Sequence, residues 1–244
     1  MTLPIVFPTY YRPDGKSGFY VRRLLDSIYN QTHQDFVVYM IGDKYYDGYE
    51  FTNIADNYDD RLKAINLSYA KERDKYKDSF LLWNYGGVNA MNTGIEAAMG
   101  DGFTHICLQN HDDFYYPQYL ESVNDCILET GADFVFCKAI YLNGNTFPSP
   151  PVPMGWRYFE HYPKFGELNT ATVCMNFSKI PFLFRDVYEL TMDGSMPADG
   201  DLWDRVRPYM LENGLKSVFI NDVLVNHEEE KYLINNFEQI KNHE

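Results

Sequence analysis

The chain has 244 residues, 45% of them hydrophobic, and a formal net charge of -14. A chain of this size buries about 70 to 75% of its unfolded surface, and no Ser/Gly/Pro-rich linker divides it, so we expect one domain. The negative charge argues against nucleic acid as a partner, because phosphate backbones require clustered Lys and Arg. A phosphorylated ligand would need a local cation, most simply a divalent metal, to reverse the sign of the field.

The start of the chain and its cysteines bear on the cellular compartment. No basic segment followed by an apolar one opens the sequence, and no run approaches the ~20 apolar residues of a membrane span. We therefore predict a cytoplasmic protein without a transmembrane segment. Reduced thiols in the core are expected for the four cysteines, which show no paired metal spacing: Cys107, Cys126, Cys137 and Cys174.

Short apolar runs alternate with helical patterns in the first half of the chain. Strands are predicted at residues 3–8, 36–42 and 62–67, and a charged loop at 71–78. Ser17 follows the first strand and is the expected N-cap of a helix. The apolar face of that helix contains Val21, Leu24, Leu25 and Ile28.

The same alternation continues toward the middle of the chain. Helices are predicted at residues 87–99 and 117–131, and strands at 105–109 and 132–141. Strands and helices that alternate at this spacing indicate an α/β domain around a mainly parallel sheet.

The second half has a different pattern. Residues 143–166 are rich in Pro, Gly and aromatic residues and form a long loop, which is typical of a functional segment. A helix is predicted at 200–213, kinked or broken near Pro208. Further strands are predicted at 170–177, 217–220 and 223–225.

Polar side chains follow the ends of several predicted strands. Thr9 and Asp43 come directly after two of them, and residues 110–113, with the sequence NHDD, follow a third. Sheets of this class bind ligands at the carboxyl ends of their strands. We therefore expect these polar groups to meet along one edge of the sheet.

Four motifs in this order resemble an inverting glycosyltransferase of the family-2 type, which has the GT-A fold. The segment IVFPTYYR at residues 5–12 is similar to the first strand and the P-T-Y-x-R turn of that family. MIGDKYYDG at 40–48 resembles its acidic strand end, which hydrogen-bonds the base of the nucleotide. Residues 89–117 match the helix, strand and D-x-D motif, and ADGDLWDRV at 198–206 matches the E-D-x-D-L-W-x-R segment.

The resemblance extends over residues 3–227 and implies a single GT-A domain with a mainly parallel, mixed central sheet flanked by helices. We assign residues 1–227 to this domain, with a nucleotide-binding half at about 1–117 and an acceptor-binding half at about 118–227. The charged tail at 228–244 is expected to be a peripheral helix or disordered.

The resemblance also implies a role for each matching residue. Asp199 occupies the position of the catalytic base, and Asp112 that of the carboxylate that holds Mn²⁺ or Mg²⁺. His227, at the end of the last strand, lies where similar enzymes often add an imidazole ligand, which favours Mn²⁺. The implied donor-binding residues are Pro8, Thr9, Tyr10, Arg12, Asp43, Asn110 and Asp112.

Three positions depart from the pattern of the family. Asn110 replaces the first Asp of D-x-D, Met91 replaces a frequent arginine, and Ala198 replaces a common glutamate. An asparagine still accepts a hydrogen bond from a hydroxyl but brings no charge. Candidates to replace the diphosphate contact of the arginine are Arg12, Lys71 and Arg73.

Structural roles remain open for several of these residues. Asp112 and Asp113 are also consistent with caps of the helix near Pro117, and Asp199 with the N-cap of its own helix. Asp201 is the rival candidate for the catalytic base.

Residues around the expected edge of the sheet also have simpler interpretations. Asp43 and Thr9 are consistent with plain turn and packing roles, and His227 with an ordinary strand-end histidine. His111 is expected to point away from the site as a structural or exposed residue. The aromatic residues of the long loop fit either a lid over the acceptor or a small separate core.

The sequence therefore predicts a metal-dependent inverting glycosyltransferase that moves a sugar from a nucleotide donor, preferably a UDP-sugar, to a hydroxyl of a glycan or glycoconjugate. Two different functions stay open. One is a sugar nucleotidyltransferase, for which the glycine- and cation-bearing YYRPDGKSG is a faint signal. The second is a non-catalytic sugar-nucleotide or glycan binding module, suggested by Asn110 and Met91.

Overall fold

The computed structural model describes residues 1–162, 164, 166–185 and 196–227. The prediction for the tail at 228–244 therefore lies outside the described residues. Strands from the whole described chain join one mixed sheet in the order β3-β2-β1-β4-β9-β6-β10-β5, in which β7 pairs with β6 and β8 with β10. The strands are β1 (Leu3–Thr9), β2 (Phe36–Gly42), β3 (Leu62–Asn66), β4 (His105–Leu108), β5 (Phe114–Tyr115), β6 (Phe134–Tyr141), β7 (Thr146–Phe147), β8 (Tyr158–Glu160), β9 (Val173–Asn176) and β10 (Ser217–His227).

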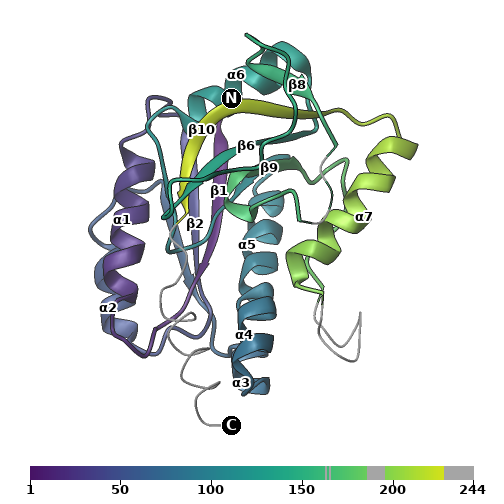
Figure 1. Ribbon diagram of the computed structural model, residues 1–244. Helices are drawn as coiled ribbons and strands as arrows, with labels where there is room; N and C mark the ends of the chain where they lie inside the picture. Colours follow the sequence, from purple (N-terminus) through teal and green to yellow (C-terminus); the bar gives the residue numbers. More distant parts are fainter. Residues whose placement is uncertain (163, 165, 186–195, 228–244) are drawn as a thin grey trace.

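Helices cover both faces of this sheet. Figure 1 shows α1 and α2 on one side and α5 on the other, with α7 beside α5. The helices are α1 (Ser17–Tyr29), α2 (Gly48–Ala55), α3 (Lys71–Lys75), α4 (Ser79–Tyr85), α5 (Val88–Gly100), α6 (Tyr119–Thr130) and α7 (Ala198–Glu212), and a 3-10 turn, η1 (Thr170–Thr172), precedes β9. This architecture confirms the predicted α/β class.

The long strands of the sheet share one direction. β1 pairs in parallel with both β2 and β4, β2 pairs in parallel with β3, and β6 pairs in parallel with β10. β9 lies antiparallel to β4 and to β6, which gives β6 and β10 the direction of β4. The carboxyl ends of β1, β2, β4, β6 and β10 therefore meet at one edge, which we call the rim.

The alternation of side chains along the strands produces a core on each face. In β2, Val38 and Met40 belong to the core under α1, α2 and α6, whereas Tyr39 and Ile41 belong to the core under α5 and α7. Successive side chains of a strand point to opposite faces, so a fully apolar strand is required when both faces are covered. All seven residues of β2 are buried, as a continuous apolar run predicts.

Several details differ from the sequence predictions. The segment 71–78 was expected to be a loop, but it begins with the short helix α3, in which Glu72 is buried. Helix α2, for which no element was predicted from the sequence, begins where the Asp47 side chain accepts a hydrogen bond from the Glu50 N–H at 2.9 Å. The helix α7 continues through Pro208, and its buried face extends to Met210.

Two further differences concern helix and strand limits. Ser17 is not a helix cap: α1 begins at this residue, and the Ser17 Oγ accepts a hydrogen bond from the Arg12 N–H at 2.6 Å. The two predicted strands at 217–220 and 223–225 form the single strand β10, whose register shifts between Ile220 and Val225. None of the described helices has both the length and the apolarity to span a membrane.

Candidate active site

The ends of β1 and β2 place Thr9 and Asp43 next to each other at the rim. Thr9 is paired with Gly42, and the Asp43 N–H donates to the Thr9 carbonyl at 2.7 Å. The Asp43 carboxylate is 2% exposed, and its Oδ2 accepts a hydrogen bond from Arg73 Nε at 3.0 Å. Burial raises the pKa of Asp43, and the positive charge of Arg73 opposes this rise.

Arg73 also stacks on the ring of Tyr10. Its guanidinium carbon lies 3.4 Å from the ring centroid, and the ring centroid of His111 lies 5.0 Å from that of Tyr10. The sequence suggested Arg73 only as a diphosphate contact, but the structure places it between the Asp43 carboxylate and the Tyr10 ring. Arg73 lies in α3, within the segment that was predicted to be a loop. The sequence therefore did not indicate that Arg73 lies beside Asp43 and Tyr10.

His111 is buried beside Tyr10, so the expectation of a residue that points away from the site is wrong. Burial and the charges of Arg12 and Arg73 lower the pKa of His111 to about 3, so the ring is neutral at physiological pH. Arg12 itself is buried and donates to both carboxylate oxygens of Asp14, at 3.2 and 3.1 Å. The predicted donor-binding Arg12 is thus at the site, with its guanidinium turned toward Asp14.

Residues 110–113 form a turn after β4, which we call the acidic turn. The Asn110 Nδ2 donates to Asp113 Oδ2 at 3.1 Å, and the other oxygen of Asp113 pairs with His227 Nδ1 at 2.8 Å. The acidic turn and the end of β10 are therefore joined through a fully buried carboxylate. Asp113 does not cap α6, whose N-cap residue is Gln118, and the capping interpretation is wrong for this residue.

Asp112 lies in this turn between two buried residues and is itself partly exposed. It does not cap α6 either, since α6 begins only after Gln118. The structure thus places the predicted metal-binding carboxylate one residue from the Asp113–His227 pair.

Asp199 reaches the same rim from the second half of the chain. β9 runs antiparallel to β4, so its start, with η1 before it, lies at the rim, and Thr170 Oγ1 of η1 donates to Asp199 Oδ2 at 3.3 Å. Asp199 lies in the first turn of α7, after the N-cap residue Pro197, and its Oδ1 accepts from the Gly200 N–H at 2.8 Å. Desolvation by the surrounding protein raises the pKa of Asp199.

Asp201, the rival for the catalytic base, has a structural environment. Its carboxylate is bound by Arg185 Nη2 at 2.5 Å and by Arg205 Nη2 at 2.7 Å, and it is buried. The two guanidinium groups occupy both oxygens of this carboxylate through charge-assisted hydrogen bonds, so neither oxygen is open to an acceptor hydroxyl. Asp199, which has a hydroxyl and backbone N–H groups as neighbours, suits proton transfer better.

Three buried polar atoms around Tyr10 lack a protein hydrogen-bond partner among the residues described. They are Thr9 Oγ1, Asp43 Oδ1 and His111 Nε2. A buried polar atom without a partner costs about 1 to 3 kcal/mol. Such atoms at the end of neighbouring strands indicate a place where a polar ligand completes the hydrogen bonding.

Comparisons with known proteins identify the family. Residues 5–189 match the family model described as glycosyl transferase family 2. The chain belongs to glycosyl transferase family 2. It is 30% identical over 232 residues to an uncharacterized glycosyltransferase of Acanthamoeba polyphaga mimivirus, with 93% of each chain covered.

Another relative and a group of solved structures agree with this assignment. An uncharacterized glycosyltransferase of Rickettsia felis is 28% identical over 117 residues, which are 48% of this chain and 16% of that protein. Residues 1–349 of S. aureus TarS in complex with UDP-GlcNAc superpose with a TM-score of 0.66 at 15% identity, covering 95% of this chain. This chain spans 59% of that TarS chain. At 15% identity, the likeness establishes a shared GT-A-like fold.

The family membership shows a glycosyltransferase that uses a nucleotide-sugar donor. It decides against both competing functions raised by the sequence, the sugar nucleotidyltransferase and the non-catalytic binding module. The departures at Asn110 and Met91 are therefore variations within a glycosyltransferase.

The candidate metal ligands of this chain are Asp112 and His227. Two protein ligands fit a cation that takes its remaining ligands from the substrate. Among the described residues, no three His, Cys, Asp or Glu side chains gather into a ready metal site. Asp112 and His227 offer an oxygen and a nitrogen, and the Asp113 carboxylate fixes His227 through Nδ1, as carboxylates commonly do for metal-binding histidines. Substrate oxygens would complete such a site.

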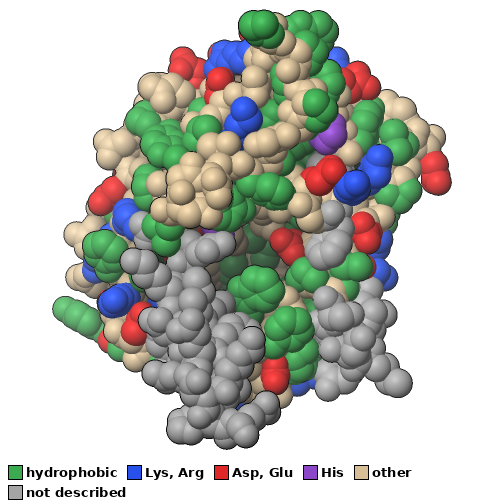
Figure 2. Space-filling view, viewed as in Figure 1, with side chains coloured by type: hydrophobic (Ala, Val, Ile, Leu, Met, Phe, Trp, Pro, Cys, Tyr) green, Lys and Arg blue, Asp and Glu red, His purple; other side chains and the backbone are tan. Residues whose placement is uncertain are grey.

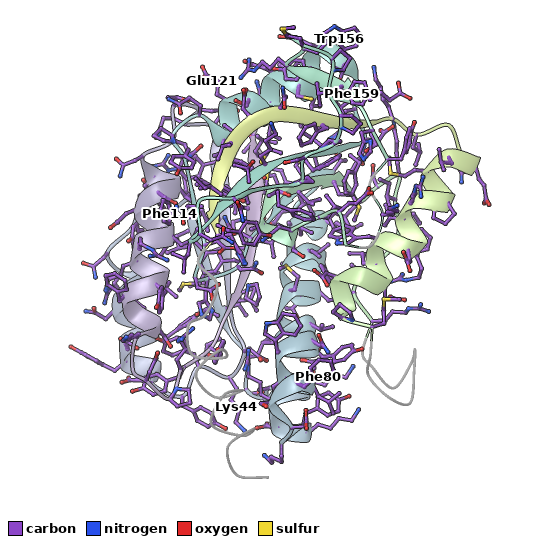
Figure 3. The ribbon with its side chains drawn as sticks, viewed as in Figure 1. Lys44, Phe80, Phe114, Glu121, Trp156 and Phe159 are labelled. Carbon is purple, nitrogen blue, oxygen red and sulfur yellow. The ribbon has the colours of Figure 1, made fainter. Side chains whose placement is uncertain are left out.

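The long loop begins at the rim, where β7 pairs with Ala139 and Ile140 near the end of β6, but its later aromatic residues lie away from the rim. β8 pairs with the first part of β10, through Val218, Phe219 and Ile220, which is the end opposite His227. Figure 3 shows Trp156 and Phe159 at the top of the molecule, far from Lys44, which follows Asp43 at the rim. This position does not fit the interpretation of these side chains as an acceptor lid, and Phe159 instead packs beside His161.

Proposed function

We propose that this glycosyltransferase is a metal-dependent inverting enzyme that moves a sugar from a UDP-sugar to a hydroxyl of a glycan or glycoconjugate. The proposal assigns the nucleotide-binding role to residues 1–117 and the acceptor-binding role to residues 118–227. It is supported by the way both halves contribute polar side chains to one rim.

The base of the nucleotide would bind at Thr9, Tyr10 and Asp43. Uracil carries an N–H between two carbonyl groups, and the unpartnered Asp43 Oδ1 is an acceptor for that N–H. The TarS structure that shares this fold was solved with UDP-GlcNAc, which supports a UDP-sugar as the donor. Pro8 precedes this group in β1, and Arg12 and Asn110 complete the proposed donor-binding set.

Asp112 and His227 Nε2 would hold Mn²⁺ or Mg²⁺ against the diphosphate. His227 Nδ1 is bonded to Asp113, so the ring presents Nε2 as its acceptor atom. The cation would supply charge neutralisation for the departing diphosphate. An imidazole ligand favours Mn²⁺ over Mg²⁺.

Asp199 would take the proton of the acceptor hydroxyl. The hydroxyl oxygen then forms a bond to the anomeric carbon, the bond from that carbon to the diphosphate oxygen breaks, and the nucleoside diphosphate leaves with the electron pair. A carboxylate whose pKa is raised is a better base than an ordinary one, and general-base help contributes about 100- to 10,000-fold. A single displacement of this kind inverts the anomeric configuration.

One observation carries the proposal: the hydrogen bond between Asp113 and His227 joins the acidic turn to the last strand, 114 residues away. This contact supports the assignment because Asp113 adjoins one candidate metal ligand, Asp112, and bonds directly to the other, His227.

The proposal is tested with a panel of nucleotide sugars, incubated with and without Mn²⁺ in the presence of a glycan mixture. Proton NMR of the product reports the anomeric configuration. We expect transfer from a UDP-sugar. The transfer should require Mn²⁺ and give the inverted anomer. A retained anomer, or equal transfer in the presence of a chelator, would contradict the inverting or the metal-dependent part respectively.

A further inference from the structure

Three polar side chains, four residues apart, contact the backbone between residues 112 and 120: Arg23 and Ser27 on one face of α1, and Gln31 just after the end of that helix. Arg23 Nη2 donates to the Asp112 carbonyl at 2.5 Å, and Ser27 Oγ accepts from the Tyr115 N–H at 3.1 Å. Residues four apart on a helix lie on the same side, so these contacts form a row along the acidic turn and β5.

Gln31 completes the row at its far end. Its Nε2 donates to the Tyr116 carbonyl at 2.9 Å, and its Oε1 accepts from the Leu120 N–H at 2.9 Å. Ser27 and Gln31 thus hold β5 and the start of α6, which have no role in the proposed chemistry. Arg23 differs from them because its contact is made to Asp112 itself.

The guanidinium of Arg23 is enclosed by aromatic rings. Its central carbon lies 5.7 Å from the ring centroid of Phe19, 5.1 Å from that of Tyr20 and 5.0 Å from that of Phe114. Phe19 and Tyr20 belong to the preceding turn of α1, whereas Phe114 follows the acidic turn (Figure 3 labels Phe114). A planar guanidinium stacks on such rings and loses little freedom when it then donates a hydrogen bond.

The contacts of the acidic turn show what Arg23 adds. The turn is fixed on one side by the pair Asp113–His227 and by the bond from Asn110 to Asp113. The peptide that follows Asp112 is held at both ends: the Asp113 N–H donates to the Asn110 carbonyl at 3.4 Å, and the Asp112 carbonyl accepts from Arg23 on the other side. A metal ligand must be held within about 0.5 Å and 10 to 20° of its working geometry.

We propose that Arg23 is a positioning residue that sets the orientation of Asp112 toward the cation and the diphosphate, through the Asp112 carbonyl. This inference rests on the proposed metal-dependent function. Arg23 touches neither substrate nor metal in this role. It acts by anchoring the peptide of the residue that does.

The role predicts an effect on donor binding that depends on the metal. Replacing a residue that orients a metal ligand costs about 10- to 100-fold in affinity for the metal. In Arg23→Met, the metal-dependent affinity for UDP is expected to fall about 10-fold, while the affinity for UDP in metal-free buffer stays unchanged. KM for the donor rises accordingly, and kcat changes less.

The matched control is Arg22→Met, the same replacement one residue earlier in α1. Arg22 Nη2 donates to Asn53 Oδ1 at 2.9 Å on the exposed side, away from the acidic turn. Arg23→Lys keeps the positive charge but loses the planar group, and we expect it to lie between the wild type and Arg23→Met.

The experiment is calorimetric titration of UDP into the wild type and the three variants, with and without Mn²⁺, with unfolding midpoints measured on the same samples. The proposal is supported if only the Arg23 variants lose Mn²⁺-dependent affinity. If Arg23→Met does not fold, Arg23→Lys decides in the same way. Wild-type affinity in a folded Arg23 variant overturns this proposal alone, whereas a wild type without any Mn²⁺ effect overturns the metal-dependent function and, with it, this proposal.

Discussion

Two carboxylates at the rim, Asp43 and Asp199, differ in exposure and in neighbours: Asp43 is buried, whereas Asp199 is partly exposed. Burial raises the pKa of each. Asp43 has the guanidinium of Arg73 at 3.0 Å, whereas Asp199 has the hydroxyl of Thr170 at 3.3 Å and the Gly200 N–H at 2.8 Å. Asp43 is balanced by a charge, whereas the donors that contact Asp199 in the described part of the chain are neutral.

This difference in neighbours suits Asp43 to ligand binding and Asp199 to proton transfer. A carboxylate paired with an opposite charge has part of the rise in its pKa offset and offers a fixed acceptor to a ligand, which suits recognition of a base. A carboxylate held only by neutral donors retains a raised proton affinity, which suits proton transfer. On the face shown in Figure 2, acidic and basic side chains are interspersed.

The largest effect is expected from Asp199→Asn. An amide cannot accept the proton of the acceptor hydroxyl, so transfer should fall about 100- to 10,000-fold while donor affinity stays nearly unchanged. Product formation and UDP titration measure the two quantities. Asp204→Asn, the same change at an exposed position of α7, is the control. Unchanged turnover in Asp199→Asn would remove this residue from the catalytic role.

Asp112→Ala comes next. The affinity for UDP in the presence of Mn²⁺ should fall by about 100-fold or more, because even a residue that only orients a metal ligand contributes about 10- to 100-fold. Calorimetry with and without Mn²⁺ measures the change. Asp60→Ala, at an exposed position before β3, should behave as the wild type. A variant that still binds UDP tightly only with Mn²⁺ would contradict the assignment of Asp112.

A smaller effect is expected from Asp43→Asn. The hydrogen bond to the uracil N–H then comes from a neutral acceptor and loses roughly half its strength, so the affinity for UDP should fall about 10-fold. The preference for UDP over CDP and GDP should narrow as well. Competition binding with the three nucleotides measures both. Equal loss for all three nucleotides would show that Asp43 does not recognise the base.

The smallest effect concerns pH and tests the neutral environment of Asp199. The Thr170 hydroxyl stabilises the charged form of Asp199, so Thr170→Val should raise the pKa of Asp199 further. The base must be deprotonated to act, and therefore the activity that is lost on acidification should be lost at higher pH in the variant. At pH 7 the rate should fall less than about 10-fold. A pH profile of kcat/KM that coincides with the wild type would contradict this contact.

Much of the fold follows from local patterns in the sequence. The apolar run at 36–42 coincides with β2, and the helical spacing at 87–99 coincides with α5 to within one residue. β2 is buried on both faces, which leaves a continuous apolar run in the sequence. α5 is buried along one stripe, which leaves apolar residues at helical spacing. The helices α2 and α3 leave a weaker signal, because one is eight residues long and the other five.

The candidate site was predictable in part. The sequence pointed to Thr9, Asp43 and Asp199, and the structure brings them to one rim. The role of Asp113 was missed, because its partner His227 lies 114 residues further along the chain and no local pattern links the two. Arg23 was missed for the same reason, since its hydrogen bond to Asp112 spans 89 residues.

The most direct test of the account is a crystal structure of the protein soaked with UDP and Mn²⁺, with the anomalous signal of manganese located at its absorption edge. The account predicts one peak within about 2.0 to 2.2 Å of an Asp112 carboxylate oxygen and of His227 Nε2, with the uracil N–H at Asp43 Oδ1. A manganese peak bound to other residues, or UDP seated elsewhere on the sheet, would contradict it.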